Sequence, residues 1–263
     1  MLAADRSGNA RDPDSGTRQS QTRQRTIVVE RFEKNQGTAV LLSGGLDSAV
    51  LLAHAAREGA VQPIYVSVGL AWEERERAAV AALLRSGAAP GAGPVAALRA
   101  DMQDVYPDTH WAIQGRAPAY HAPDEDVHIE GRNIVLLAKA AVFMARAGLP
   151  RVLIGLLAGN PFPDASPEYF DAMARALSIG LATPIAIEAP FAKMRKADVI
   201  RLGVELGVPL ELSLSCMQPH GRVHCGRCSK CRERIEAFRE AGVPDPTRYW
   251  VTNAADESSR RRS

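Results

Sequence analysis

Residues 43–48, which read Ser-Gly-Gly-Leu-Asp-Ser, have the types and spacing needed to bind a chain of phosphates. Two adjacent glycines allow unusual backbone angles and leave no side chain in the way of a ligand. The hydroxyls of Ser43 and Ser48 add donors, and the first amides of a following helix would face an anion. No Gly-Lys-Ser/Thr closes the segment, so it is not a Walker loop. A Ser-Gly-Gly turn taken alone is equally compatible with an ordinary loop.

The four cysteines lie within sixteen residues, at Cys216, Cys225, Cys228 and Cys231. Thiolates two residues apart can converge on one tetrahedral ion, with metal–sulfur bonds near ~2.3 Å. Redox chemistry would use only two of them, and an iron–sulfur cluster is the alternative that also needs four. We therefore predict a structural zinc site that holds a C-terminal loop and helix, with His220 and His224 as spare ligands.

Two further segments carry polar residues beside predicted helix and strand ends. Gly131, Arg132 and Asn133 open a long helical segment, where an Arg and an Asn suit contacts with an anion or a purine. An ordinary helix cap is the alternative. Residues 159–164 form a rigid loop after an apolar strand, which would place them at the ligand-binding edge of a sheet.

In combination, these motifs resemble a known family. Ser-Gly-Gly-x-Asp-Ser is similar to the pyrophosphate loop of the ATP pyrophosphatases, and together with the cysteine cluster it resembles the 7-cyano-7-deazaguanine synthases. Further matches are the segments 131–133, 163–170, 196–200 and 214–216. The resemblance covers about residues 38–245.

The resemblance implies an ATP-dependent ligase that adenylates 7-carboxy-7-deazaguanine and joins it to ammonia. The resulting amide is dehydrated to a nitrile in queuosine and deazapurine biosynthesis. It implies structural Zn²⁺, Mg²⁺ on the phosphates, and ATP as co-substrate; we also expect a homodimer and no membrane or nucleic-acid partner. The expected catalytic residues are Asp47, Lys196 and Arg132, with the two cations on phosphate or carboxylate. The expected ATP-binding residues are Leu42, Ser43, Gly44, Gly45, Leu46, Asp47 and Ser48. The expected substrate-binding residues are Gly131, Arg132, Asn133, Asn160 and Asp164, and the metal ligands are the four cysteines.

The chain departs from the family pattern in its substrate-facing segments. Residues 68–74 replace a Tyr-Gly-Gln-Arg-His stretch, residues 157–164 are altered, and Met217 stands where the family has tyrosine. A relative that adenylates another acid, or modifies a tRNA or a protein, is therefore a second hypothesis. A non-catalytic nucleic-acid-binding zinc module is a third, although a net charge of +2 and 5% aromatic residues do not favour it.

These residues must be positioned by alternating strands and helices. Apolar runs predict strands at 38–42, 62–68, 95–98, 151–155 and 184–189. Helical spacing of apolar residues predicts helices at 49–56, 73–84, 134–147, 196–206 and 230–241. Ser166 is predicted to cap one more helix. This alternation predicts a parallel five-stranded α/β sheet with helices on both faces, Rossmann-like and similar to the adenine nucleotide alpha hydrolases. Ligands bind such a sheet at the carboxyl ends of its strands. Residues 101–130 interrupt the pattern and are predicted to form a loop or lid, whose three histidines we expect to be solvated.

Composition supports one α/β domain of ordinary size, since the chain has 263 residues and is 46% hydrophobic. We expect a disordered leader at 1–26, an ATP-binding domain at 27–212 that begins with a short edge strand at 26–30, a zinc-binding subdomain at 213–245 and a tail at 246–263. The absence of a signal-like start and of a long apolar run predicts a cytoplasmic protein.

Overall fold

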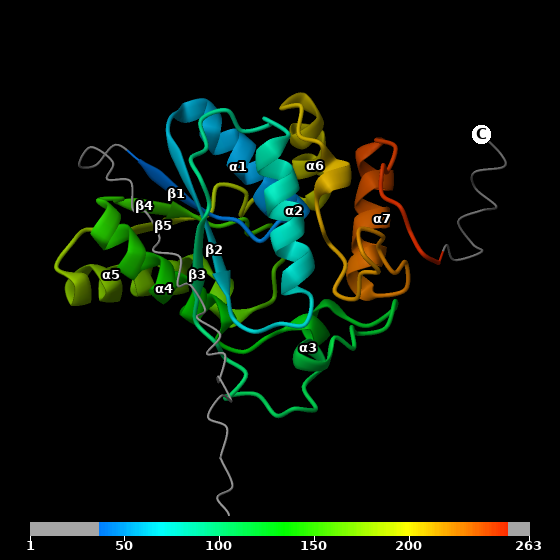
Figure 1. The fold of residues 1–263 in the computed structure, drawn as a ribbon, viewed down its shortest axis with the longest axis horizontal. Helices are drawn as coiled ribbons and strands as arrows, with labels where there is room; N and C mark the ends of the chain where they lie inside the picture. The colour runs from blue at the N-terminus through cyan, green and yellow to red at the C-terminus, as the bar shows by residue number, and fades with distance from the viewer. Residues whose placement is uncertain (1–36, 252–263) are drawn as a thin grey trace, which may run out of the picture.

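The computed structural model describes residues 37–251, which form one five-stranded sheet with helices on both faces (Figure 1). All strand pairs are parallel, and the order across the sheet is β3-β2-β1-β4-β5. The strands are β1 (Thr38–Leu41), β2 (Val61–Ser67), β3 (Ala96–Arg99), β4 (Arg151–Leu153) and β5 (Ala186–Glu188). The predicted α/β fold with a parallel five-stranded sheet is confirmed.

The central strand β1 shows why the sheet is covered on both sides. All four of its residues are buried, and successive side chains point to opposite faces. Ala39 and Leu41 belong to one core cluster, whereas Val40 belongs to the other. A parallel strand buried on both faces reads as a continuous apolar run, as this one does.

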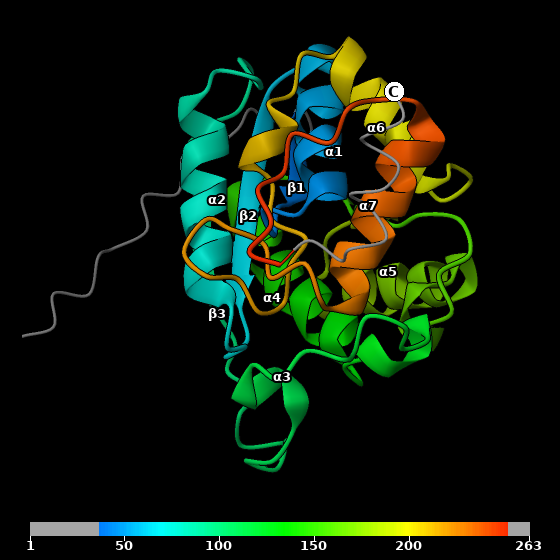
Figure 2. The same cartoon turned by 90° about the vertical axis from the view of Figure 1, so that its right-hand side faces the viewer.

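The helices divide between the two faces, as the two perpendicular views show (Figure 2). Helices α1, α2, α6 and α7 cover one face, and α4 and α5 cover the other. The α-helices are α1 (Leu46–Glu58), α2 (Glu73–Arg85), α3 (Trp111–Gln114), α4 (Arg132–Ala147), α5 (Pro167–Leu181), α6 (Lys196–Glu205) and α7 (Ser229–Ala241). Short 3-10 turns are η1 (Asp124–Val127), η2 (Pro163–Ala165) and η3 (Leu210–Leu212).

Local sequence explains several helix ends. Ser166 caps α5 by accepting a 3.1 Å hydrogen bond from the amide of Tyr169, and Pro167 occupies the first helical position. Gly148 ends α4 in the left-handed conformation that glycine adopts without strain. The predicted cap of α5 is confirmed by this geometry.

The segment 101–130 contains only α3 and η1, so the expected loop includes two short helical turns. The leader at 1–26 and the edge strand at 26–30 lie outside the described residues. Residues 246–251, which we assigned to the tail, run beside the cysteine-rich loop, where the amide of Trp250 donates to the carbonyl of His224 at 2.7 Å. No helix within residues 37–251 is long and apolar enough to cross a membrane.

The strand order reverses between β1 and β4. The chain leaves β1 toward β2 on one side, and it later returns through α4 to place β4 on the other side. The loops that follow these two strands therefore diverge at the carboxyl end of the sheet. Open α/β sheets bind ligands at such a point.

Candidate active site and cysteine cluster

The phosphate loop, residues 43–48, lies between β1 and α1 as predicted. Gly44 has a φ of +79°, and a Cβ there would lie 2.9 Å from the carbonyl oxygen of Glu76. Gly45 precedes the helix, and no side chain caps the first turn of α1. Ser48 Oγ donates to the carbonyl of Gly45 at 3.0 Å and lies 3.3 Å from Ser43 Oγ. The amides in the first turn of α1 are therefore available to bind an anion, and two hydroxyl groups lie beside them.

The loop after β4 approaches the same helix turn. A Cβ on Gly155 would lie only 3.3 Å from the backbone nitrogen of Ser48, so a larger residue would crowd the turn. On the opposite side, the amide of Leu214 donates a 2.8 Å hydrogen bond to the carbonyl of Gly44. The phosphate loop is thus held between the β4 loop and the segment that leads to the cysteine cluster.

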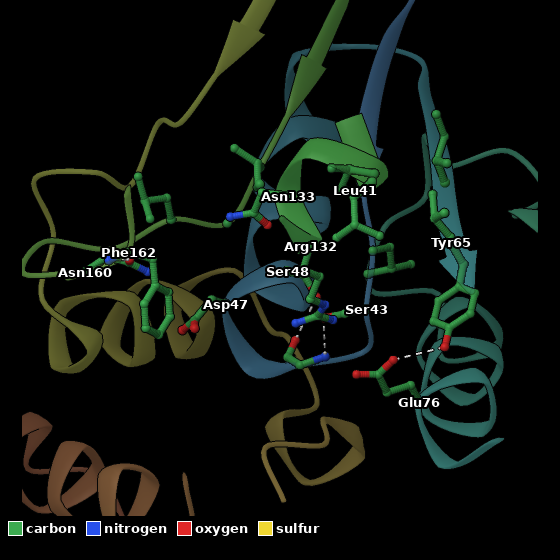
Figure 3. Close-up of a pocket in the computed structure, with 18 residues that line it drawn as sticks. Leu41, Ser43, Asp47, Ser48, Tyr65, Glu76, Arg132, Asn133, Asn160 and Phe162 are labelled. Carbon is green, nitrogen blue, oxygen red and sulfur yellow. Dashed lines mark hydrogen bonds between the residues drawn. The ribbon is translucent and has the colours of Figure 1, made fainter. Parts of the chain in front are cut away.

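A cavity of about 250 Å³ opens at the point where β1 and β4 diverge (Figure 3). Its wall combines the phosphate loop, the ends of β1 and β2, the start of α4 and the loop after β4. The polar or aromatic residues in its lining are Ser43, Asp47, Ser48, Tyr65, Glu76, Arg132, Asn133, Asn160 and Phe162. The structure therefore brings the predicted residues Arg132, Asn133 and Asn160 together with the phosphate loop.

Arg132 begins α4 and reaches the cavity beside the phosphate loop. Its Nε is buried and has no hydrogen-bond partner within the described chain. The preceding residue, Gly131, takes the left-handed conformation with a φ of +70°, which lets the chain turn sharply into the helix. An unpaired buried guanidinium nitrogen is costly, which favours an anionic ligand at this point.

Sequence reasoning missed a buried carboxyl group, Glu76 on α2, which lines the same cavity. Its two oxygens accept hydrogen bonds from Tyr65 Oη and Trp72 Nε1, both at 3.0 Å. Burial raises the pKa of Glu76, although the positive charge of Arg132 opposes the shift. The signal that could have found it is the Trp72–Glu76 spacing of four, which places both on one helix face.

The expected catalytic residues Asp47 and Lys196 meet in a second charged group, which we call the Lys196 cluster: Asp47, Lys196, Lys230 and Glu233. Lys196 Nζ lies 3.3 Å from Asp47 Oδ2 and also contacts Glu233 Oε1. Glu233 Oε2 lies 2.6 Å from Lys230 Nζ. All four residues line a smaller cavity of about 180 Å³ that shares Asp47 and Asn160 with the larger one.

The charged groups in this cluster shift one another's pKa values. Burial alone would lower the pKa of Lys196, but the carboxylates of Asp47 and Glu233 raise it well above its usual range. Burial raises the pKa of Asp47 despite the attraction of Lys196. Burial also opposes ionisation of Glu233, yet Lys196 and Lys230 lower its pKa to about 2. Asp47 Oδ1 is buried and has no partner among the described residues.

Two of the expected substrate residues bind each other. The amide of Asn133 donates to Asp164 Oδ2 at 3.0 Å, and Asn133 Nδ2 donates to the Asp164 carbonyl at 3.1 Å. Asp164 therefore covers the open start of α4 and is not among the residues that line either cavity. Asn160 accepts a 2.9 Å hydrogen bond from the amide of Phe162, which shapes the loop between the two cavities.

The second half of the segment 101–130 lies next to the site. The ring of His128 stacks on Phe162 with centroids 4.8 Å apart. Asp124 lies 3.7 Å from Arg232 on α7, and the amide of Ser229 donates to the carbonyl of Pro118. None of its histidines belongs to a group in the described chain that could hold a metal.

The four cysteine sulfurs converge as predicted, because the loop from residue 216 returns to the start of α7. All four are buried, and their Sγ atoms lie within 4.8 Å of one another. Cys228 and Cys231 are 3.5 Å apart, and Cys225 and Cys231 are 3.9 Å apart. A tetrahedral ion with bonds near ~2.3 Å spaces its sulfurs by about 3.8 Å, so the group could hold one metal ion.

Backbone amides around the sulfurs also suit thiolates. Cys216 Sγ accepts from the amides of Gln218 and Cys225, at 3.3 and 3.2 Å. His224 Nε2 accepts from the amide of Ser215 at 3.0 Å, and the ring of His220 stacks on Trp250. Within the described chain, the group that could hold a metal ion therefore consists of the four cysteines alone.

Arg234 ties this region to the body of the protein. Its side chain is 1% exposed and donates to Thr247 Oγ1, Ser213 Oγ, Ser215 Oγ and the Leu210 carbonyl. Asp245 Oδ1 lies 3.8 Å from its Nε. The segments before and after the cysteine loop are thus bound to one side chain of α7.

Comparison with known proteins agrees with the sequence motifs. The sequence model of the family described as "Queuosine biosynthesis protein QueC" matches residues 38–242. Proteins named 7-cyano-7-deazaguanine synthase are similar over most of the chain. The one from Methanothrix thermoacetophila is 36% identical and covers 81% of this chain and 99% of its own length. Those from Methanopyrus kandleri (36%) and Anaeromyxobacter dehalogenans (34%) cover 81% and 80% of this chain, and 98% and 94% of their own.

Proposed function

The chain belongs to the family of the queuosine biosynthesis protein QueC, and on this basis we propose that it is an ATP-dependent ligase that converts 7-carboxy-7-deazaguanine and ammonia to 7-cyano-7-deazaguanine. The observation that carries the proposal is the phosphate loop at the sheet reversal, with two buried polar atoms beside it that have no partner in the described chain. These atoms are Asp47 Oδ1 and Arg132 Nε. A magnesium-bound phosphate chain supplies a cation for the first and an anion for the second.

The chemistry requires adenylation because a carboxylate is a poor electrophile. Transfer of AMP from ATP to the acid turns one carboxylate oxygen into part of a good leaving group and releases pyrophosphate. Attack by ammonia then expels AMP and gives the amide. The amide oxygen must leave in the same way before the nitrile forms. Each oxygen therefore departs within an AMP phosphate.

The residues of the site divide this work. The amides of the first turn of α1 and the hydroxyls of Ser43 and Ser48 bind the phosphates. Arg132 and Lys196 offset the negative charge that accumulates as the phosphorus is attacked. Asn160 lines the same cavity, as does Asn133, whose side-chain nitrogen is bound to Asp164 and whose side-chain oxygen stays available; these two side chains orient the acid.

Two metal ions fit the residues present. Mg²⁺ would be held by the Asp47 carboxylate, whose Oδ1 is buried and has no partner in the described chain, and it would reduce repulsion between the phosphates and the attacking carboxylate. Zn²⁺ would be held by the four cysteines, which leave no position open for a substrate, so it would stabilise the fold. The ligase function requires only the first of these at the reacting atoms.

The wall formed by α2 bears on the acceptor. The Glu76 carboxyl group lines the cavity. Glu76 lies on α2, two residues after the segment 68–74 that departs from the family pattern. A carboxylate there could accept from the ring N–H and amino group of a guanine-type base. Because the sequence before this wall differs from the family pattern, adenylation of another acid is the second candidate function.

The experiment is an oxygen-transfer assay. We expect the protein, incubated with ATP, magnesium, ammonium and 7-carboxy-7-deazaguanine labelled with ¹⁸O in its carboxylate, to produce AMP that carries ¹⁸O together with unlabelled pyrophosphate. Release of ADP and phosphate would indicate acyl-phosphate chemistry instead. Labelled AMP with a different acid, and none with this one, would support the second candidate. If no deazaguanine acid or amide causes the protein to form AMP, the ligase function is contradicted.

We further propose ammonia, free or delivered by a partner, as the nitrogen source, a cytoplasmic location where ATP is supplied, and a homodimer. Size-exclusion chromatography with light scattering tests the last of these directly. A monomer at assay concentration would contradict it without affecting the proposed reaction.

A further inference from the structure

Glu233 lies two residues after the last cysteine, yet its carboxylate reaches the ATP-binding site on the other side of α7. We propose that Glu233 is a positioning residue: it fixes the ammonium of Lys196 beside the phosphate loop, so that the helix anchored by the cysteine cluster completes the nucleotide site. This inference rests on the proposed function only in that the bound nucleotide is ATP.

The geometry places the Lys196 ammonium between two carboxylates. Asp47 Oδ2 lies 3.3 Å from Lys196 Nζ on the side of the phosphate loop, and Glu233 Oε1 contacts the same nitrogen from α7. A lysine side chain has four rotatable bonds and loses considerable entropy when it is held. With Asp47 as its sole partner, the ammonium would swing toward the carboxylate that the metal ion needs. Glu233 on the opposite side keeps it at a fixed distance.

Glu233 itself is held firmly. Lys230, one turn earlier on α7, binds its second oxygen at 2.6 Å. The next residue, Arg234, is fully buried and binds the segments at Ser213 and Thr247. Cys228 precedes the first residue of α7, and Cys231 lies in its first turn. The carboxylate therefore extends from a helix that is fixed on two sides.

A purely structural bridge between α6 and α7 is the alternative explanation. These helices are already joined elsewhere, because Arg195 contacts Glu240 and Arg201 donates to the carbonyl oxygens of Glu240 and Ala241. Moreover, Glu233 and Lys196 both line the smaller cavity, next to the unpaired oxygen of Asp47. A bridge that served stability alone would have no reason to face that cavity.

The test is equilibrium binding of a nucleotide that cannot react, α,β-methylene-ATP with Mg²⁺, measured by titration calorimetry on the zinc-loaded full chain. We expect Glu233→Gln to weaken binding about tenfold, as for the loss of one charge-assisted hydrogen bond. Glu233→Asp should recover part of the loss. Lys230→Gln should weaken binding about threefold, because Glu233 is then less firmly held. The control Glu236→Gln, one turn later on α7 and exposed, should bind as wild type does.

A double-mutant cycle separates positioning from stability. In a Lys196→Gln background, Glu233→Gln should have no further effect on nucleotide binding, since the ammonium that it positions is gone. Zinc content and melting temperature should be equal in Glu233→Gln and Glu236→Gln. Wild-type affinity in Glu233→Gln, or an additive loss in the double mutant, would overturn the inference. Absence of binding by wild type would overturn the proposed function as well, so the two failures can be told apart.

Discussion

Helix α7 carries two neighbouring charged groups, the buried Arg234 and the half-buried Glu233, whose surroundings differ. Arg234 points toward the segments flanking the cysteine loop, and all of its nitrogens have oxygen partners. Glu233 points the other way, into the Lys196 cluster, where Asp47 Oδ1 has no partner in the described chain. Removing a buried charge whose partners are all present destabilises a fold, whereas a charged cluster that contains an unpartnered buried oxygen leaves room for a ligand. The contrast predicts that the Arg234 side of α7 serves stability and the Glu233 side serves nucleotide binding.

The largest effect should follow the loss of the metal, because both sides depend on the position of α7. We expect Cys228→Ser to hold much less than one zinc per chain and to lower the free energy of unfolding by on the order of 5 kcal/mol, a fraction of a typical structural zinc contribution. Metal analysis and chemical denaturation measure this. Arg227→Gln, an exposed neighbour in the same loop, is the control. Full stability without zinc, or bound iron with visible absorption, would contradict a structural zinc site.

Asp47→Asn should separate function from stability. It removes the charge that would hold magnesium, so we expect turnover to fall by about 10³-fold or more. Because Asn keeps the shape of the side chain, the unfolding free energy should change by about 1 kcal/mol or less. Steady-state AMP release and thermal melting provide the two readings, with Arg57→Gln at the far end of α1 as control. Activity within a few-fold of wild type would move the catalytic centre elsewhere.

Arg234→Met should show the reverse pattern. The change leaves the hydroxyls of Ser213 and Ser215 and the Leu210 carbonyl without their buried donor, which costs about 3–5 kcal/mol of stability. The folded fraction should still bind nucleotide with nearly wild-type affinity. Denaturation curves and nucleotide titration at low temperature measure both quantities, and Arg175→Met on the exposed side of α5 is the control. A loss of affinity without a loss of stability would reverse the assignment of the two sides.

The smallest effect should come from Thr247→Val, which removes one of the oxygens around Arg234 and keeps the side-chain shape. Arg234 retains its other partners, so we expect a loss of about 1 kcal/mol and unchanged turnover. Differential scanning calorimetry resolves a change of this size. A loss as large as that of Arg234→Met would mean that Thr247, and not the whole set of partners, anchors the loop.

The sequence by itself determined the parts of this protein that depend on neighbouring residues. The strand–loop–helix around Ser43–Ser48 and the cap of α5 follow from local turn and helix chemistry, and the cysteine spacing places four thiolates in one group. The strands and helices lie within about three residues of their predicted ends, because apolar periodicity is also a local property.

Only the tertiary structure decided which polar side chains meet. Asn133 and Asp164 are 31 positions apart, and both were expected to face the substrate, yet they bond to each other. Lys196 and Glu233 come from different helices, and nothing in the pattern of either helix indicates that they share an ammonium–carboxylate contact. Such partners depend on how the helices pack across the sheet, and a charged residue on a helix reads the same in sequence whether it faces water or a buried cavity.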